Sequence, residues 1–146
     1  MLIKHMPARM GSLSELLTFI TDQAQKKDFS PDGISRVRLV AEEALVNVFN
    51  HAYPAAEGDV EVCVNASGES ALVVEIRDTG IAFNPLSLPE PDVKADVAQR
   101  KVGGMGVFFI RRMADDAQYR RENGSNSLTL TFSDRRKASS GATDSN

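Results

Sequence analysis

The stretch ALVVEIRDTG, residues 71–80, has large apolar residues at every second position from Leu72 to Ile76, and its aspartate is soon followed by a glycine. Period-two alternation over this length is typical of a β-strand with one buried face. Leu72, Val74 and Ile76 share that face, and the same alternation assigns Asp78 to it. Because an unpaired carboxylate is costly to bury, Asp78 requires a partner at the end of the strand.

The sequence on either side of this strand extends the sheet. A preceding strand is predicted where three valines alternate with other residues, at Val60, Val62 and Val64. Further along, residues 117–122 and 127–132 flank Asn123-Gly124, which is a strong signal for a hairpin turn. A short first strand is expected over residues 2–6.

Helices are predicted between the first and second strands. Ser12 and Glu15 form a capping-box pattern, and apolar residues at helical spacing predict a helix over 13–26. A second helix begins with Ser30 as its N-cap, followed by a proline at the first helical position. It is expected to continue to about residue 53.

The order of these elements indicates the fold class. Residues 84–102 form a long, proline-containing loop of the kind that serves as a lid or is disordered, and a third helix extends from about 103 to 114. The small, polar residues 133–146 predict a disordered tail. Residues 1–132 are therefore expected to form an α+β domain, a two-layer sandwich with helices on one face of a mixed, mainly antiparallel sheet.

Composition excludes several classes of function. The 146 residues suit one domain, and no apolar stretch approaches the ~20 residues of a membrane helix. Basic and acidic residues, 17 and 20 in number, are mixed along the chain, so no basic face for nucleic acid is expected. Cys63 is the only cysteine, which excludes an internal disulfide. With no signal-peptide pattern at its start, the chain is expected to be cytoplasmic, without a membrane or nucleic-acid partner.

A polar stripe on the second predicted helix is the first candidate site. Glu43, Asn47 and His51 are four residues apart and lie beside the apolar stripe, at the edge of the core. A ligand could lie there, although such a triplet by itself is more typical of a half-exposed polar margin. Glu42 lies further round the helix and is interpreted as solvated.

The end of the central strand is the second candidate site. The amino group of an adenine would satisfy Asp78 and make a pocket selective; alternatively, the carboxylate turns outward and caps the turn through backbone N–H groups. Gly80 would let a ring approach the backbone closely, or would serve a turn with positive φ. Phe83 is interpreted as a core residue.

The third candidate site is Gly103-Gly-Met-Gly106 at the start of the third predicted helix. Backbone N–H groups and the helix dipole at such a position can bind phosphate, although a short glycine run can also be a hinge. Arg100 and Lys101, in the loop just before, could reach a phosphate or could lie on the solvated surface.

Together, these three sites resemble the ATP-binding domain of the GHKL superfamily, and most closely its stand-alone anti-sigma serine-kinase branch. EALVN (43–47) and HAY (51–53) are similar to the family's N box. DTG (78–80) with Phe83 is similar to the first glycine box, and GGMGVFFI (103–110) to the second. The match continues to about residue 132, and the order and spacing of the boxes make it specific.

The resemblance implies the Bergerat α/β sandwich and a role for each matched residue. Asp78 would accept from the adenine amino group, and Asn47 would hold Mg²⁺ against the phosphates of ATP. Gly104 and Gly106 would donate backbone N–H groups to phosphate, and Glu43 would be the general base. The boxes and the lid place the remaining expected ATP contacts at Gly80, Phe83, Arg100, Lys101, Gly103 and Met105.

The resemblance also implies partners. Kinases of this branch phosphorylate a serine or threonine of a STAS-domain anti-anti-sigma protein, bind a sigma factor, and commonly form homodimers. Some of them carry an arginine just before the second glycine box, where this chain has Val102. The leading hypothesis is a protein serine/threonine kinase, and the alternative is an ATP-gated module that sequesters a sigma factor or another regulator without phosphoryl transfer.

Overall fold

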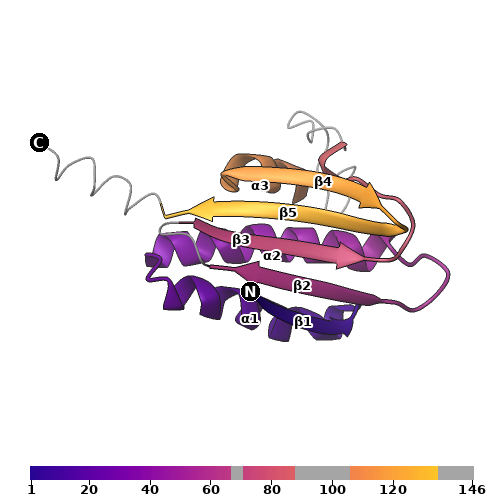
Figure 1. The fold of residues 1–146 in the computed structure, drawn as a ribbon, viewed down its shortest axis with the longest axis horizontal. Coiled ribbons are helices and arrows are strands. Elements are labelled where there is room, and N and C mark those ends of the chain that lie inside the picture. The colour runs from indigo at the N-terminus through magenta and orange to yellow at the C-terminus, as the bar shows by residue number, and fades with distance from the viewer. Residues whose placement is uncertain (67–70, 88–105, 135–146) are drawn as a thin grey trace, which may run out of the picture.

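A computed structural model describes residues 1–66, 71–87 and 106–134. Its strands form one five-stranded sheet in the order β1-β2-β3-β5-β4 (Figure 1). The bounds are β1 (Leu2–Pro7), β2 (Asp59–Asn65), β3 (Ala71–Asp78), β4 (Asp116–Glu122) and β5 (Ser125–Ser133). Each of the four pairings is antiparallel, so the sheet that was predicted to be mixed is antiparallel throughout the described strands.

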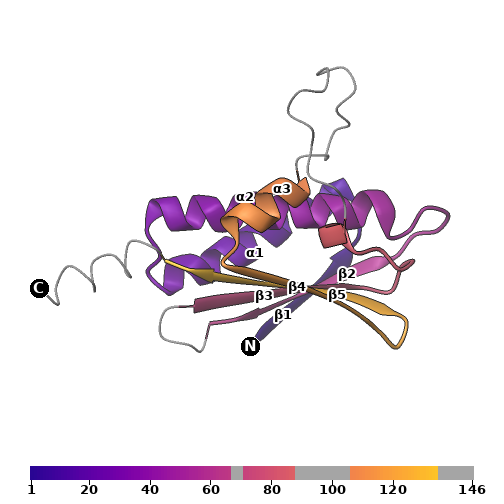
Figure 2. The same cartoon turned by 90° about the horizontal axis from the view of Figure 1, so that it is seen from above.

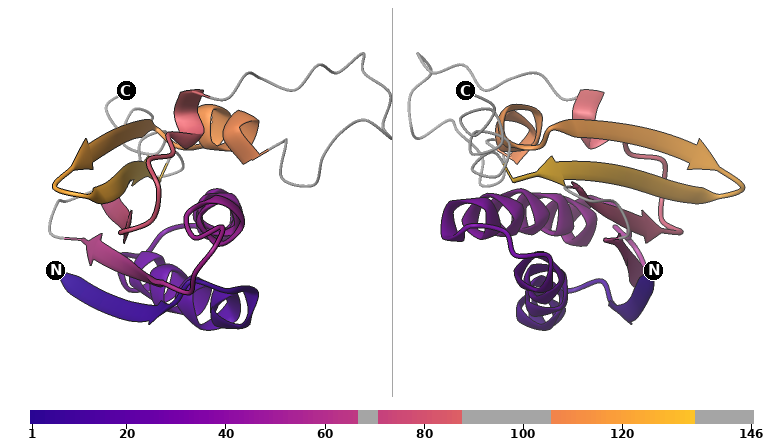
Figure 3. Two further views of the ribbon diagram at one scale, coloured as in Figure 1. Left: turned by 90° about the vertical axis from the view of Figure 1, so that its right-hand side faces the viewer. Right: turned by 60° about the vertical axis from the view of Figure 1, so that its left-hand side comes forward.

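The helices cover one face of this sheet. They are α1 (Leu13–Lys26), α2 (Pro31–His51) and α3 (Gly106–Met113), with single 3-10 turns η1 (Met10–Ser12) and η2 (Pro85–Ser87). Figures 2 and 3 show the helical layer on one side of the sheet and the other side uncovered. The predicted two-layer α+β fold is confirmed. Within the described ranges, none of the helices combines the length and the apolar character that crossing a membrane requires.

The core lies between the helices and the covered face of the sheet. The alternation predicted from sequence is confirmed, because every second residue of the three central strands is buried there. Cross-strand neighbours stack in layers on that face, such as Ile76 with Leu128 and Val74 with Leu130. The buried strand residues are Val60, Val62, Val64, Leu72, Val74, Ile76, Leu128, Leu130 and Phe132.

The hairpin between β4 and β5 forms where it was predicted. Asn123 and Gly124 both have positive φ, 52° and 78°. Positive φ at both central positions is what a two-residue turn of the tight hairpin type requires, and Asn-Gly adopts it most readily. The turn fixes the register of β5 and so determines which of its residues face the helices.

The N-termini of α1 and α2 differ in how they are capped. Ser30 caps α2 as predicted, because the Gly33 backbone N–H donates to its Oγ at 3.0 Å. The capping box predicted at Ser12 is wrong, because Ser12 has helical φ and ψ of −90° and −12° and its side chain caps nothing. The turn η1 runs directly into α1, whereas a capping side chain needs an extended backbone.

The folded part of the chain extends slightly beyond residue 132, the predicted end of the domain. β5 ends at Ser133, and Asp134 is buried against the start of α2. Residues 135–146, which make up most of the predicted tail, lie outside the described residues.

Cys63 carries a packed thiol. It is buried on β2, and its thiol donates a weak hydrogen bond to Glu61 Oε1 at 3.4 Å. Burial, followed by the hydrogen bond and the negative charge of Glu61, raises the pKa of Cys63 to about 11.

Candidate functional site

A pocket lies between the C-terminal half of α2, the end of β3 and the β4–β5 hairpin. Its walls are mostly apolar, with a few polar residues among them. The lining residues are Ala44, Asn47, Val48, Ala52, Ile76, Asp78, Phe83, Pro85, Tyr119, Asn126 and Leu128. The space inside is about 20 Å³, which holds about one water molecule. A larger ligand can therefore enter only if part of the lining moves.

Asp78 combines the two environments that the sequence left open. Its carboxylate is buried on the core face, with 6% of the residue exposed. One carboxylate oxygen, Oδ1, also caps the turn, because it accepts from the Gly80 backbone N–H at 2.9 Å. The same oxygen accepts from Asn126 Nδ2 at 2.8 Å. Both bonds use Oδ1, and Oδ2 accepts no hydrogen bond from the described residues.

Gly80 is required by a close backbone approach. A Cβ built at this position would lie 2.0 Å from the carbonyl oxygen of Ala52, which is the C-cap residue of α2. The same carbonyl accepts from the Ile81 backbone N–H at 2.9 Å. Gly80 does not have positive φ, so the turn alternative does not explain it. Its role in this structure is to let the loop after β3 lie against the end of α2.

The polar stripe of α2 separates into three environments. Asn47 is 3% exposed, lines the pocket, and its Nδ2 has no hydrogen-bond partner among the described residues. A buried amide without a partner is rare in native structures and indicates a missing ligand or water. Glu43 is half-buried one turn earlier, and burial, followed by the negative charge of Glu42, raises the pKa of Glu43. Glu42 is itself half-buried rather than fully solvated.

The third member of the stripe, His51, lies outside the pocket. It is exposed and stacks on Phe83, with 4.6 Å between ring centroids and 21° between the planes. Phe83 was interpreted as a core residue, and the structure places it half-buried in the pocket wall. The stack of His51 on Phe83 joins α2 to the loop after β3.

Sequence reasoning gave no role to two polar residues of the site, Asn126 and Tyr119. Asn126 is 5% exposed and pairs with Asp78 across the β3–β5 ladder. The Tyr119 hydroxyl donates to Asn126 Oδ1 at 2.5 Å. The sequence carries no local signal for this pair, because the Asn-Gly turn fixes the register between β4 and β5, whereas Asp78 lies opposite Asn126 in the separate β3–β5 pairing.

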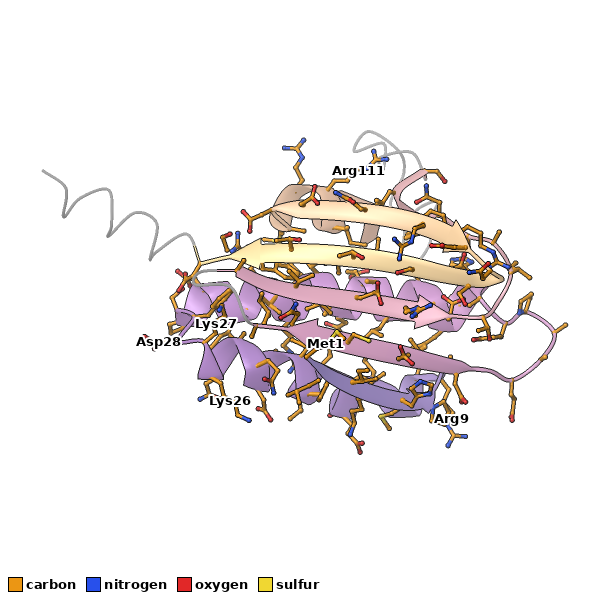
Figure 4. The ribbon with its side chains drawn as sticks, viewed as in Figure 1. Met1, Arg9, Lys26, Lys27, Asp28 and Arg111 are labelled. Atoms are coloured by element: carbon orange, nitrogen blue, oxygen red, sulfur yellow. The ribbon has the colours of Figure 1, made fainter. Side chains whose placement is uncertain are left out.

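The predicted phosphate site is described only at its end. Arg100, Lys101, Val102 and residues 103–105 (Gly103, Gly104 and Met105) lie outside the described residues. Gly106 begins α3. Arg111, labelled beside α3 in Figure 4, donates a hydrogen bond to the carbonyl oxygen of Leu86 and so joins α3 to η2.

The residues of the pocket fit a nucleotide, and they fit a metal ion that binds mainly to oxygens of that nucleotide. Apolar walls that include the Asp78 carboxylate suit a flat ring that carries an amino group. No group of three or more His, Cys, Asp or Glu side chains suited to a metal occurs in the described part of the chain. A cation would therefore depend on oxygens of the ligand itself, together with the Asn47 amide oxygen. Mg²⁺ has this preference, because it keeps several waters and commonly binds substrate phosphates.

Comparisons with known proteins are consistent with this geometry. The family model described as a histidine kinase-like ATPase domain matches residues 6–132. The serine-protein kinase RsbW of Bacillus mycoides (strain KBAB4) is 23% identical over 130 residues, which cover 86% of this chain and 81% of that protein. The RsbW of Bacillus cereus (strain G9842) is 24% identical with the same coverage.

Two solved structures share the fold. One contains the RsbU and RsbW domains of Rv1364c from Mycobacterium tuberculosis, with a TM-score of 0.59 and 12% identity. The similarity covers 91% of this chain and only 32% of that chain. The other is the SiaB-SiaC complex from Pseudomonas aeruginosa, with a TM-score of 0.52, 15% identity, and coverage of 90% and 89%.

Proposed function

Since this chain belongs to the histidine kinase-like ATPase domain family, we propose that it is an ATP-dependent protein serine/threonine kinase and anti-sigma regulator. Its substrate would be a STAS-domain anti-anti-sigma protein in a partner-switching system. The observation that carries the proposal is the pocket itself. It joins a buried carboxylate, with one oxygen available at Asp78, to a buried amide without a partner at Asn47.

The base of ATP would bind at Asp78. Oδ1 is already held by two N–H donors, which leaves Oδ2 to accept from the adenine amino group. Ile76, Leu128 and Val48 supply apolar surface for the ring. Because the pocket is narrow, Phe83 and Pro85 would have to move as the base enters.

The phosphates would extend from the base along α2 toward α3. Asn47 and Glu43, one helical turn apart, would lie beside the triphosphate. Bound Mg²⁺ would neutralise charge that develops on the transferring phosphoryl group, and Asn47 Oδ1 is the protein oxygen assigned to hold it. The glycines at 103, 104 and 106, with Arg100 and Lys101, remain the proposed phosphate contacts.

Glu43 is proposed as the general base. It would accept the proton of the attacking serine or threonine hydroxyl as that oxygen bonds to the γ-phosphorus and the bond to ADP breaks. A raised pKa suits this role, because a more basic carboxylate takes the proton more readily. Glu43 does not line the pocket itself, but it lies one helical turn before Asn47 and is half-buried, so a second protein could reach it.

The proposed partners rest on the relatives. The similar Bacillus proteins are named serine-protein kinases, and one structural neighbour was solved as a complex of two proteins. A sigma factor as second partner and a homodimer as the assembly are part of the same proposal. An ATP-gated module that sequesters a regulator without chemistry is the second candidate, and Val102 in place of an arginine favours it.

Labelled ATP separates the two candidates. The full chain is incubated with γ-labelled ATP, Mg²⁺ and a panel of STAS-domain proteins. Transfer of label to a serine or threonine of one of them is expected. Tight ATP binding without transfer to any of them would favour the sequestering module, and absence of ATP binding would contradict both.

A further inference from the structure

Asn126 has every hydrogen-bonding position of its side chain occupied by protein. Its Nδ2 donates to Asp78 Oδ1 at 2.8 Å and to the Ile81 carbonyl oxygen at 2.7 Å. Its Oδ1 accepts from the Tyr119 hydroxyl and from the Phe83 backbone N–H, at 2.5 Å and 3.3 Å. A side-chain amide offers two donor hydrogens and two acceptor lone pairs. Asn126 therefore lines the pocket with no capacity left for a ligand.

The partners of Asn126 also fix which way its amide points. The Ile81 carbonyl can only accept, so the nitrogen must face it. The Phe83 backbone N–H can only donate, so the oxygen must face it. The amide thus joins β3, the loop after it and β4 in one defined orientation.

This orientation determines what Asp78 presents to the pocket. Donors from Asn126 and Gly80 both bond Oδ1 and so restrict rotation of the carboxylate. Oδ2 is then held in place as an acceptor. An amino group on a bound ring would satisfy it, whereas a ring carbonyl at the same place would set two acceptors against each other.

We propose that Asn126 is a positioning residue for nucleotide selectivity: it holds Asp78 so that the site selects a purine with a 6-amino group. Tyr119 acts one step further out, by holding the oxygen of Asn126. The inference rests on the proposed binding of ATP, and it names residues that act through Asp78 without touching the nucleotide.

A merely structural role for Asn126 makes a different prediction. If Asn126 only braced the loop, its loss would weaken every purine nucleotide to the same degree. If it acts through Asp78, its loss weakens only ligands that carry the 6-amino group. Purine riboside 5′-triphosphate lacks that group and is otherwise the same ligand as ATP, so it separates the two roles.

The test measures both ligands by calorimetry on the full chain. We expect the wild type to prefer ATP over purine riboside 5′-triphosphate by about tenfold, the equivalent of one buried hydrogen bond. In Asn126→Ala this preference should fall to within about twofold, through weaker ATP binding alone. Tyr119→Phe should reduce the preference in the same direction, by about two- to fivefold. Thr129→Ala, on the uncovered face of β5, should leave it unchanged.

The outcomes are distinct. If the preference for ATP persists in both variants, or if Asn126→Ala weakens the affinity for both ligands equally, the role of Asn126 is overturned. The proposal that the chain binds ATP then still stands. If the wild type binds ATP and purine riboside 5′-triphosphate equally well, the role of Asp78 is overturned, and this inference is overturned with it. Thermal unfolding confirms that each variant is folded; if Asn126→Ala is not, Tyr119→Phe alone decides the result.

Discussion

His51 of α2 stacks on Phe83 of the loop after β3, with 4.6 Å between the ring centroids. Phe83 lines a pocket with about 20 Å³ of space, and His51 lies outside it. The stack therefore holds one wall of the pocket from the outside. Since an adenine does not fit the space present, the contact opposes the movement that would admit the base.

Replacing His51 by alanine is expected to speed ATP association. The stack contributes about 0.5–1.5 kcal/mol, so the association rate constant should rise by roughly two- to tenfold. His51→Phe keeps a ring against Phe83 and should retain the wild-type rate. Stopped-flow measurement with a fluorescent ATP analogue gives the rate constants. An unchanged rate in His51→Ala would show that Phe83 does not limit entry.

Glu43→Gln should abolish transfer without abolishing ATP binding. Loss of a positioned base typically costs ~10²–10⁴ in rate, and Glu43 is assigned no contact to ATP in the ground state. Glu42→Gln is the matched control, because it removes the same charge one residue away and should retain most of the rate. Single-turnover transfer to the STAS-domain substrate gives the rates. Equal rates for the two variants would contradict the assignment.

The pH dependence of transfer should follow the ionisation of Glu43. Glu43 acts as a base only when ionised, and burial, followed by the charge of Glu42, raises its pKa. The acid limb of the rate profile should therefore lie at higher pH than for an ordinary glutamate. Glu42→Gln removes one of the two causes, so the limb should move to lower pH. Glu57→Gln, in an exposed loop, is the control and should not move it. A limb that stays in place in Glu42→Gln would contradict this coupling.

Asn47→Ala should remove the magnesium-dependent part of ATP affinity. Asn47 is the buried amide assigned to the metal, and its side chain makes no hydrogen bond through Nδ2 that alanine would break. Calorimetry with and without Mg²⁺ measures the difference in ATP affinity, which should disappear in Asn47→Ala and persist in Asn50→Ala, at an exposed position of α2. Equal strengthening by Mg²⁺ in the wild type and Asn47→Ala would exclude Asn47 as a ligand.

Asp134→Ala should destabilise the fold. The carboxylate of Asp134 accepts from the Ser30 backbone N–H at 2.8 Å and from Ser30 Oγ at 3.0 Å, at the start of α2. Removing these buried bonds should lower the free energy of unfolding by about 1–3 kcal/mol. Asp116→Ala, whose carboxylate bonds only Gln118 among the described residues, at the surface, should change it by less than about 0.5 kcal/mol. Urea denaturation measures both, and equal stabilities would contradict the prediction.

Local sequence determined where the helices, strands and turns lie and which face of each strand is buried. Alternation along 71–78 placed Leu72 and Asp78 on the covered face, and Asn123-Gly124 fixed the hairpin. These features could be predicted because strand and turn geometry depend on neighbouring residues. The capping box at Ser12 failed for the opposite reason. Whether a serine caps a helix depends on the backbone that enters it, and here that backbone is a 3-10 turn.

Tertiary structure alone decided how the site is assembled. Asp78 and Asn126 are 48 residues apart, and Gly80 lies against Ala52 at the end of a helix from a different part of the chain. No periodicity encodes such pairs, because they arise from the order of strands in the sheet and from the position of α2 across it. The sequence assigned Asp78 to the covered face of its strand and left open whether the carboxylate would be buried there or turn outward. The packing of β5 and α2 around it determined that one carboxylate oxygen is held by the protein and the other remains for a ligand.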